Sequence, residues 1–192
     1  MTFRIEPVKY EDIDILYDLY VHAHVTDPLQ PFLYPSLSWA EQIQFESTGP
    51  KEVFLKHPWV HYHKIVDAET GIAAWSRWHF PRVLKDHEKE EKTDKDYFPE
   101  KIPEGANQEL MQEFFDKILK VEEEYIDREK RYFINYLAVH PDYQRKGLGS
   151  MLMRIGLDAA DRDGAETFLV ATAKARYKAS RRGRNSNLFV YD

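Results

Sequence analysis

Residues 137–151 read L-A-V-H-P-D-Y-Q-R-K-G-L-G-S-M, and this stretch decides the fold. An apolar run, typical of a strand buried in a sheet, stops at Pro141. A basic turn with two glycines follows, and an apolar helical pattern begins directly after it. The order strand, basic glycine turn and helix indicates a site for an anionic ligand at the turn.

The residue types in the turn explain this interpretation. A helix N-terminus leaves backbone N–H groups without partners and carries partial positive charge. Gly147 and Gly149 allow close approach of a ligand and a positive φ, while Arg145 and Lys146 add positive charge. Together they suit a pyrophosphate held by main-chain donors. The alternative is a tight strand-to-helix turn whose glycines serve geometry alone.

Two common phosphate motifs are excluded. The chain has no G-x-x-x-x-G-K-[ST], so a P-loop is ruled out. A G-x-G-x-x-G fingerprint also fails, because position 152 is leucine.

Composition sets the general class of the protein. The chain has 192 residues, of which 43% are hydrophobic and 31% charged, which fits one soluble domain. It has no cysteine, so disulfides and a cysteine nucleophile are excluded, and a cytoplasmic location is expected. We expect neither a signal peptide nor a membrane span. The net charge of -6 argues against a dedicated nucleic-acid binder.

Hydrophobic periodicity predicts a mixed α/β order around the quoted stretch. The expected strands are 3–8, 59–66, 72–80, 132–139 and 166–172. The first expected helix begins near Asp12, where Asp12 or a neighbour can cap it. The second runs from Ser38 to about Pro50, with a further short turn before Pro58 as an alternative, and the others run from Asn107 to about Lys130 and from Ser150 to Asp161. S-W-A-E at 38–41 is a capping-box pattern. The other expected segments are a loop at 26–35, a charged insertion at 82–104 and a basic tail at 173–192.

The block from Leu137 to Ser150 resembles the acetyl-CoA motif of the GNAT superfamily of N-acetyltransferases. That motif is Q/R-x-x-G-x-G/A after a strand ending in a run like L-A-V-x-P, and here it spans Gln144–Gly149. The following helix and the upstream order of elements also resemble the family, particularly a fungal-type subgroup. The resemblance covers roughly residues 3–172.

This resemblance implies the fold and the cofactor. It implies a single GNAT-like domain over 1–192, with a mixed central sheet that splays at an acyl-CoA slot and is flanked by helices. Acetyl-CoA would be the co-substrate, with no metal. The cofactor-binding residues implied are Leu137, Ala138, Val139, Gln144, Arg145, Lys146, Gly147, Leu148, Gly149 and Ser150.

The resemblance also implies a reaction. The primary amine of a small molecule or peptide would attack the thioester directly, without a covalent enzyme intermediate. A backbone N–H of Leu137 or Val139 would polarise the thioester carbonyl. A base or a water chain would remove a proton from the amine. Tyr177 is the nearest candidate for the general acid that protonates the leaving thiolate.

The C-terminal part departs from the family pattern. Tyr177 follows its strand at a shorter spacing than usual, and the last strands of the family are missing, since Leu188–Tyr191 can supply one short strand at most. We therefore expect impaired turnover and little order in 173–192. An exposed edge at 166–172 is expected to pair with the L-F-V-Y end, with a second subunit or with aggregates, so self-association is also expected. The alternative function is a non-catalytic acyl-CoA-binding relic of the same fold.

Other conspicuous residues have simpler interpretations. His61 and His63 share a strand face, but no third ligand is evident, so we expect no metal site. Trp75 and Trp78 are expected to pack the sheet. The basic run at 174–184 is interpreted as a solvated tail or a contact to the CoA 3′-phosphate, and no sequence-specific DNA binding is expected.

Overall fold

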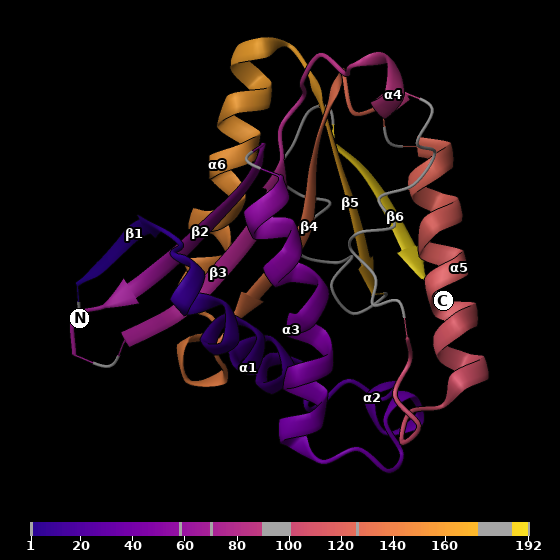
Figure 1. The fold of residues 1–192 in the computed structure, drawn as a ribbon. Coiled ribbons are helices and arrows are strands. Elements are labelled where there is room, and N and C mark those ends of the chain that lie inside the picture. Colours follow the sequence, from indigo (N-terminus) through magenta and orange to yellow (C-terminus); the bar gives the residue numbers. More distant parts are fainter. Residues whose placement is uncertain are drawn as a thin grey trace.

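A computed structural model describes residues 2–57, 59–69, 71–89, 101–125, 127–172 and 186–191. Its centre is one six-stranded sheet whose strands lie in sequence order (Figure 1). The strands are β1 (Phe3–Pro7), β2 (Val60–Asp67), β3 (Gly71–His79), β4 (Arg131–Val139), β5 (Glu166–Thr172) and β6 (Ser186–Tyr191). Pairing is antiparallel from β1 to β4 and parallel from β4 to β6, which confirms the predicted mixed sheet.

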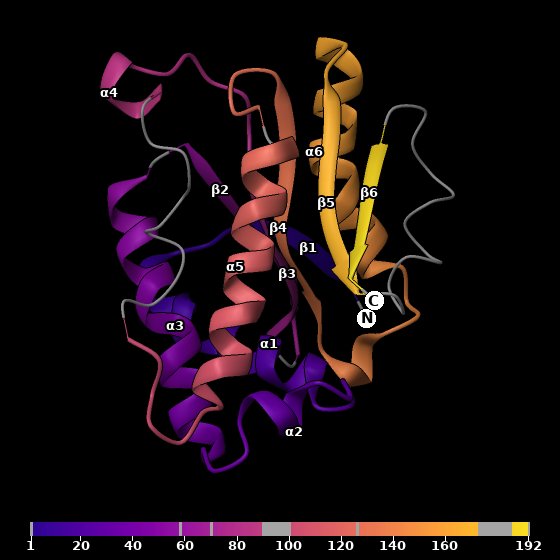
Figure 2. The same cartoon turned by 90° about the vertical axis from the view of Figure 1, so that its right-hand side faces the viewer.

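Helices cover both faces of this sheet (Figure 2). The first face carries α1 (Ile13–His24), α3 (Trp39–Lys56) and α5 (Gln108–Tyr125), and the opposite face carries α6 (Leu148–Asp163). Two short helices, α2 (Gln30–Leu33) and α4 (Asp86–Lys89), lie in the connections. The predicted layers of one α/β domain are therefore present.

The two tryptophans of β3 anchor the core on opposite faces of the sheet. Trp75 and Trp78 are both fully buried, as predicted. Trp75 belongs to the cluster that includes Tyr17 of α1, whereas Trp78 packs with Ala159 and Ala160 of α6. The Trp78 Nε1–H also donates to the carbonyl of Leu152 at 3.3 Å. These contacts fix α1 and α6 against the middle of the sheet.

Helix α3 begins as predicted but ends later than predicted. Ser38 Oγ accepts from the Glu41 N–H, and Glu41 Oε2 accepts from the Ser38 N–H at 2.8 Å, which completes the capping box. The predicted end near Pro50 was wrong, because the helix continues through it to Lys56. Proline removes only the one bond to the Glu46 carbonyl, and the Pro50 ring is buried. Packing therefore outweighs the missing bond.

Three other predicted boundaries were wrong. The segment predicted as a loop at 26–35 contains α2, with Pro31 in its first turn where a missing N–H is harmless. Helix α5 has its predicted cap, since the Leu110 N–H donates to Asn107 Oδ1 at 3.1 Å. It ends at Tyr125, earlier than predicted, and the Lys130 and Arg131 N–H groups then turn back onto the Asp127 carbonyl. α6 begins two residues earlier than predicted, at Leu148.

The C-terminal strand changes the predicted edge of the sheet. β6 pairs in parallel with β5, in register from Thr167↔Ser186 to Thr172↔Tyr191. Of the pairings expected for the edge at 166–172, the one with the L-F-V-Y end at 188–191 is therefore present, and it covers that edge. Residues 173–185, which include Tyr177 and the basic run, lie outside the described residues, as do 90–100 of the charged insertion. Among the helices described, none combines the length and apolarity needed to cross a membrane.

Asp12 has a different role from the predicted helix cap. Its Oδ2 accepts from the Lys9 N–H and from Lys64 Nζ, each at 2.7 Å, and makes no cap bond to α1. The Lys64 and Asp12 side chains are only 10% and 16% exposed. Burial acts to raise the pKa of Asp12, but the hydrogen bonds from Lys64 and Lys9 outweigh it, so the pKa is lowered. The pair ties β2 to the start of α1.

We expect Asp12→Asn to lower the free energy of unfolding by about 2 kcal/mol at pH 7, because it leaves Lys64 charged without its carboxylate. Since the folded pKa of Asp12 lies below the unfolded value of about 3.9, its stabilisation is present above that pH. This stabilisation is lost as the pH falls through the pKa of Asp12 in the folded state. Urea unfolding at pH 7 and pH 3 should therefore show a smaller difference between wild type and variant at pH 3.

Asp14→Asn is the matched control, because the Asp14 side chain is 61% exposed in its pair with Lys51. A surface pair contributes about 0–1 kcal/mol, so this control should change stability little at either pH. Equal decreases in the free energy of unfolding in the two variants would contradict the role assigned to Asp12.

Candidate functional site

Strands β4 and β5 pair only at their beginnings. The parallel register runs from Arg131↔Glu166 to Ile134↔Leu169, and within the described residues it extends no further. Both strands nevertheless continue, β4 to Val139 and β5 to Thr172, and Figure 1 shows their far ends running apart. The splay that the resemblance implied is therefore present, and beyond Ile134 the main chain of β4 is not paired with β5 within the described residues.

A β-bulge occurs where the splay begins. The pairing of β3 with β4 shifts between Arg77 and Trp78, which leaves Asn135 as the extra residue of β4. Arg77 donates to Asn135 Oδ1, and its guanidinium carbon lies 4.4 Å from the ring centre of Tyr136. The bulge therefore directs two consecutive side chains, those of Asn135 and Tyr136, to the α1 side of the sheet.

The turn after β4 has the positive φ predicted at Gly147, but not the one predicted at Gly149. A 3-10 turn at Pro141–Tyr143 leads into residues 144–147, which are all exposed. Arg145 and Gly147 adopt left-handed conformations with φ of 65° and 85°, and Gly147 is the N-cap of α6. The first N–H groups of α6 have no acceptors inside the helix. An anion at this point would meet those donors and the basic side chain of Arg145.

Neighbouring contacts hold the turn in place. The Tyr143 ring is buried against Phe3 at a centroid distance of 6.0 Å, and Lys146 Nζ lies 4.6 Å from the centre of the Tyr143 ring. Gln144 Nε2 donates to the Val139 carbonyl at 3.3 Å. A Cβ added at Gly149 would lie 3.6 Å from Val139, so the start of α6 passes close to the end of β4.

The structure brings together the residues predicted to bind the cofactor. Leu137 is 36% exposed on β4, whereas the Ala138 side chain is buried in the core on the α1 side. Val139 packs towards α6. The turn residues follow within the same short segment at the open end of the splay: Gln144, Arg145, Lys146, Gly147, Leu148, Gly149 and Ser150. Their roles towards acetyl-CoA stay predictions, and so does the role of Tyr177.

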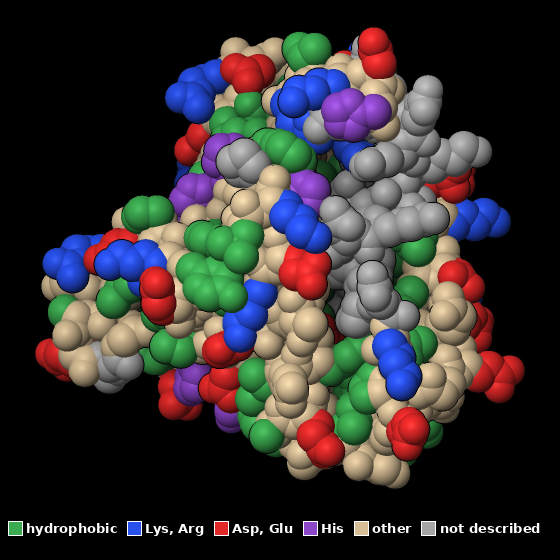
Figure 3. Space-filling model, in the orientation of Figure 1, with side chains coloured by type: hydrophobic (Ala, Val, Ile, Leu, Met, Phe, Trp, Pro, Cys, Tyr) green, Lys and Arg blue, Asp and Glu red, His purple; other side chains and the backbone are tan. Residues whose placement is uncertain are grey.

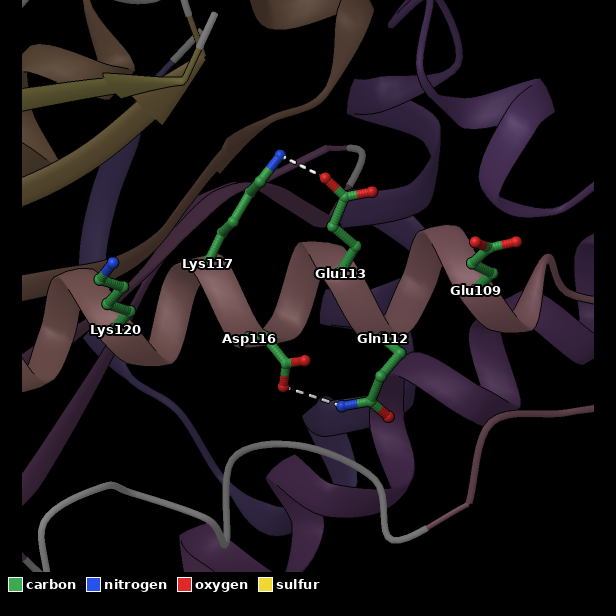
Figure 4. Close-up of a pocket in the computed structure, with 6 residues that line it drawn as sticks. All are labelled: Glu109, Gln112, Glu113, Asp116, Lys117 and Lys120. Atoms are coloured by element: carbon green, nitrogen blue, oxygen red, sulfur yellow. Dashed lines mark hydrogen bonds and ion pairs between the residues drawn. The ribbon is translucent and has the colours of Figure 1, made fainter.

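A shallow hollow lies elsewhere, on the exposed face of α5 (Figure 4). It has a volume of about 460 Å³, and it is lined by one helix, by Glu109, Gln112, Glu113, Asp116, Lys117 and Lys120. Lys117 pairs with Glu113 at 2.6 Å, and Gln112 donates to Asp116 at 2.9 Å. Side chains that satisfy one another on an open helix face are typical of a solvated surface.

Charges of both signs are mixed on the surface. Figure 3 shows basic and acidic side chains interspersed over the visible face of the molecule. The part of the chain that the structure describes holds no group of three or more His, Cys, Asp or Glu side chains able to bind a metal ion. His61 instead packs its ring against Phe80 at a centroid distance of 4.3 Å.

Comparisons with known proteins agree with this geometry. The sequence profile of the acetyltransferase (GNAT) family matches residues 107–182, which include α5, β4, the turn, α6 and β5. A solved structure described as histone acetyltransferase HPA2 and related acetyltransferase, from Corynebacterium glutamicum, aligns with a TM-score of 0.55 and 14% identity. The alignment covers 95% of this chain and 83% of that one. No curated protein sequence matches the chain significantly.

Two further structures align less closely. A transcriptional regulator from Bacillus halodurans has a TM-score of 0.49 at 14% identity, over 94% of this chain and 88% of that one. A GNAT family acetyltransferase from Brucella melitensis in complex with acetyl-CoA has a TM-score of 0.47 at 13% identity, over 93% and 82%. The family profile over residues 107–182 and the alignment with the Corynebacterium glutamicum structure show that the domain is GNAT-like in fold.

Proposed function

We propose that this protein transfers the acetyl group of acetyl-CoA to a primary amine of a small molecule or peptide. The observation that carries the proposal is the splay of β4 from β5 next to the turn at 144–150. The splay leaves a strand edge for the pantetheine arm, and the turn offers main-chain donors for the pyrophosphate. The cysteine-free composition fits a cytoplasmic enzyme, and the order of elements fits the fungal-type subgroup.

The residues present fit acetyl-CoA. The left-handed backbone at Arg145 and Gly147 and the glycine at 149 leave room for phosphate oxygens at the start of α6. When bound, acetyl-CoA supplies an activated thioester carbonyl. The main-chain N–H groups of Leu137 and Val139 would orient that carbonyl and stabilise negative charge on its oxygen. The amine attacks as the neutral base, so a nearby group must take its proton.

Acetyl-CoA binding and thiol release should be measured on one sample, by calorimetry and with a panel of primary amines. We expect binding together with amine-dependent thiol release, slower than roughly 1 s⁻¹ because the C-terminal part departs from the family. Binding with no release above background for any amine would support the non-catalytic acyl-CoA-binding relic instead. Absence of binding would contradict both interpretations.

A further inference from the structure

A small cavity lies where β3 ends and β4 begins. It has a volume of about 20 Å³, whereas roughly 10–15 Å³ is enough for one water molecule, so it has room for one compact ion. Its basic lining residues are Arg82, Arg128, Arg131 and His79. Aromatic rings supply the rest of the described lining, those of Trp59, Phe80 and Phe133. None of these seven side chains is acidic.

The main chain places these side chains together. His79 is the pairing partner of Phe133 in the register of β3 with β4. The Arg82 N–H donates to the Arg128 carbonyl at 3.1 Å, so the segment that leaves β3 lies against the one that enters β4. In Figure 1 this end of β4 is at the top of the view, and the arrowhead that leads to the turn at 144–150 lies below. Since β4 has nine residues, its two ends are roughly 25 Å apart.

Other contacts hold two of the guanidinium groups. The guanidinium carbon of Arg82 lies 3.8 Å from the centre of the Trp59 ring, so stacking engages its face while its N–H groups lie in the plane at its edge. Arg131 Nε donates to Glu166 Oε2 at 2.8 Å, and Arg131 Nη1 donates to the Tyr125 carbonyl. A guanidinium has five N–H donors, so these two bonds do not exhaust Arg131.

The electrostatic potential in this region is positive. Burial lowers the pKa of His79 well below its ordinary value, and the charges of Arg77 and Arg128 lower it further, as do His57 and His61. The imidazole of His79 is therefore neutral at pH 7, and the positive charge at the cavity comes from arginine.

The carboxylates just before β4 are engaged with other groups. Asp127 pairs with Lys130 at 2.9 Å, and Glu129 Oε1 accepts from the Leu84 N–H at 3.0 Å. Neither residue is part of the described lining of the cavity. Three cations thus surround a space that is small, partly apolar and suited to negative charge.

We propose that this cavity binds a compact monovalent anion of the size of chloride, held by Arg82, Arg128 and Arg131. Hydrogen bonds from a guanidinium to an anion are roughly twice as strong as those between neutral groups. The aromatic walls keep water away, which strengthens the attraction between the charges. Size provides the selectivity, because the cavity admits one small ion and excludes a bulky organic anion.

The bound anion links the segment that leaves β3 to the one that enters β4. A ligand that binds only the folded state stabilises it in proportion to the logarithm of its concentration above Kd. Neither acetyl-CoA nor the amine takes part, so this site stands or falls independently of the proposed function.

The test is thermal unfolding of the full chain while sodium gluconate is replaced by sodium chloride at constant ionic strength. Gluconate is too large for the cavity and serves as the reference anion. Between about 1 and about 100 mM chloride, we expect the Tm of wild type to rise by about 3–5 °C, which corresponds to a Kd of roughly 10 mM. Arg128→Gln removes one cation from the lining and should lose most of this shift.

Arg154→Gln is the matched control. Arg154 lies on α6, its side chain is 72% exposed, and it pairs with Asp158 on the surface. This variant should show the same chloride-dependent shift as wild type. Arg82→Gln is the second lining variant and serves if Arg128→Gln does not fold.

Diffraction from wild-type crystals in sodium bromide locates the ion directly, because bromide scatters anomalously. We expect an anomalous peak between the three guanidinium groups. The proposal is overturned if the lining variants keep the full chloride shift, if gluconate stabilises wild type as well as chloride does, or if no bromide occupies the cavity. Bromide in the cavity without a chloride-dependent shift in Tm would show binding at crystal concentration only and would also overturn it.

Discussion

Replacing Gly147 and Gly149 together by aspartate is expected to abolish acetyl-CoA binding. The two added carboxylates would occupy the start of α6 and repel the pyrophosphate that this turn is proposed to hold. At Gly147, where φ is 85°, any side chain also strains the backbone. Calorimetry should show a loss of affinity of at least about 1,000-fold, equivalent to roughly 4 kcal/mol.

Gly71→Asp separates charge at the turn from backbone strain in general. Gly71 has a φ of 95° and lies in the β2–β3 hairpin, and a Cβ there meets nothing within 4 Å. This control adds the same side chain at a similar left-handed position, so it should leave acetyl-CoA affinity unchanged. Unaltered affinity in the double variant would show that the turn does not bind the cofactor.

Gly156→Ala is expected to destabilise the fold, although alanine normally favours a helix. A Cβ at this position would lie 2.3–2.5 Å from atoms of the Trp78 ring. Trp78 is fully buried and packs with Tyr132 and Ile134, so it has no free space to move into. Overpacking of this kind costs about 1–3 kcal/mol, more than the gain of about 1 kcal/mol in helix propensity. Urea unfolding measures the net loss.

Gly149→Ala on the same helix provides the comparison. Its Cβ would meet only Val139 Cγ2, at an ordinary contact distance of 3.6 Å. The gain in helix propensity from glycine to alanine is then not offset by a steric clash. The free energy of unfolding should therefore stay constant or rise slightly. If both variants had the same stability, the close approach of α6 to β3 at Trp78 would be in doubt.

Features that depend on neighbouring residues could be predicted from the sequence. The glycine turn, the Ser38 capping box and the Asn107 cap each depend on groups within a few positions of one another. The continuation of α3 through Pro50 could not be predicted, because it depends on burial of the proline by residues distant in the sequence. The left-handed Arg145 was also missed, since few non-glycine residues adopt that conformation.

The contacts of Tyr136 with Tyr17 and Tyr20, and of Tyr34 with Glu46, are non-local, and this explains why the sequence did not reveal them. Tyr17 and Tyr20 share a helix face because they lie three residues apart, which is the one signal available. Glu46, Tyr34 and Tyr136 come from three other segments, and only the packing of α3 and β4 against α1 brings them near one another. No spacing in the chain encodes that approach.

The bulge at Asn135 has a consequence for how the gene can change. Asn135 and Tyr136 project to the same side of β4, while Ile134 and Val139 pack towards α6. Loss of the Asn135 codon would therefore restore a regular pleat and leave every other side chain of β4 on its present face. Loss of a codon elsewhere in the strand would invert part of it, except at Tyr136, whose loss would remove a ring packed against Tyr17 and Tyr20. Among single-codon deletions in β4, selection should tolerate this one best, and it would remove an acceptor for Arg77 while sparing the core.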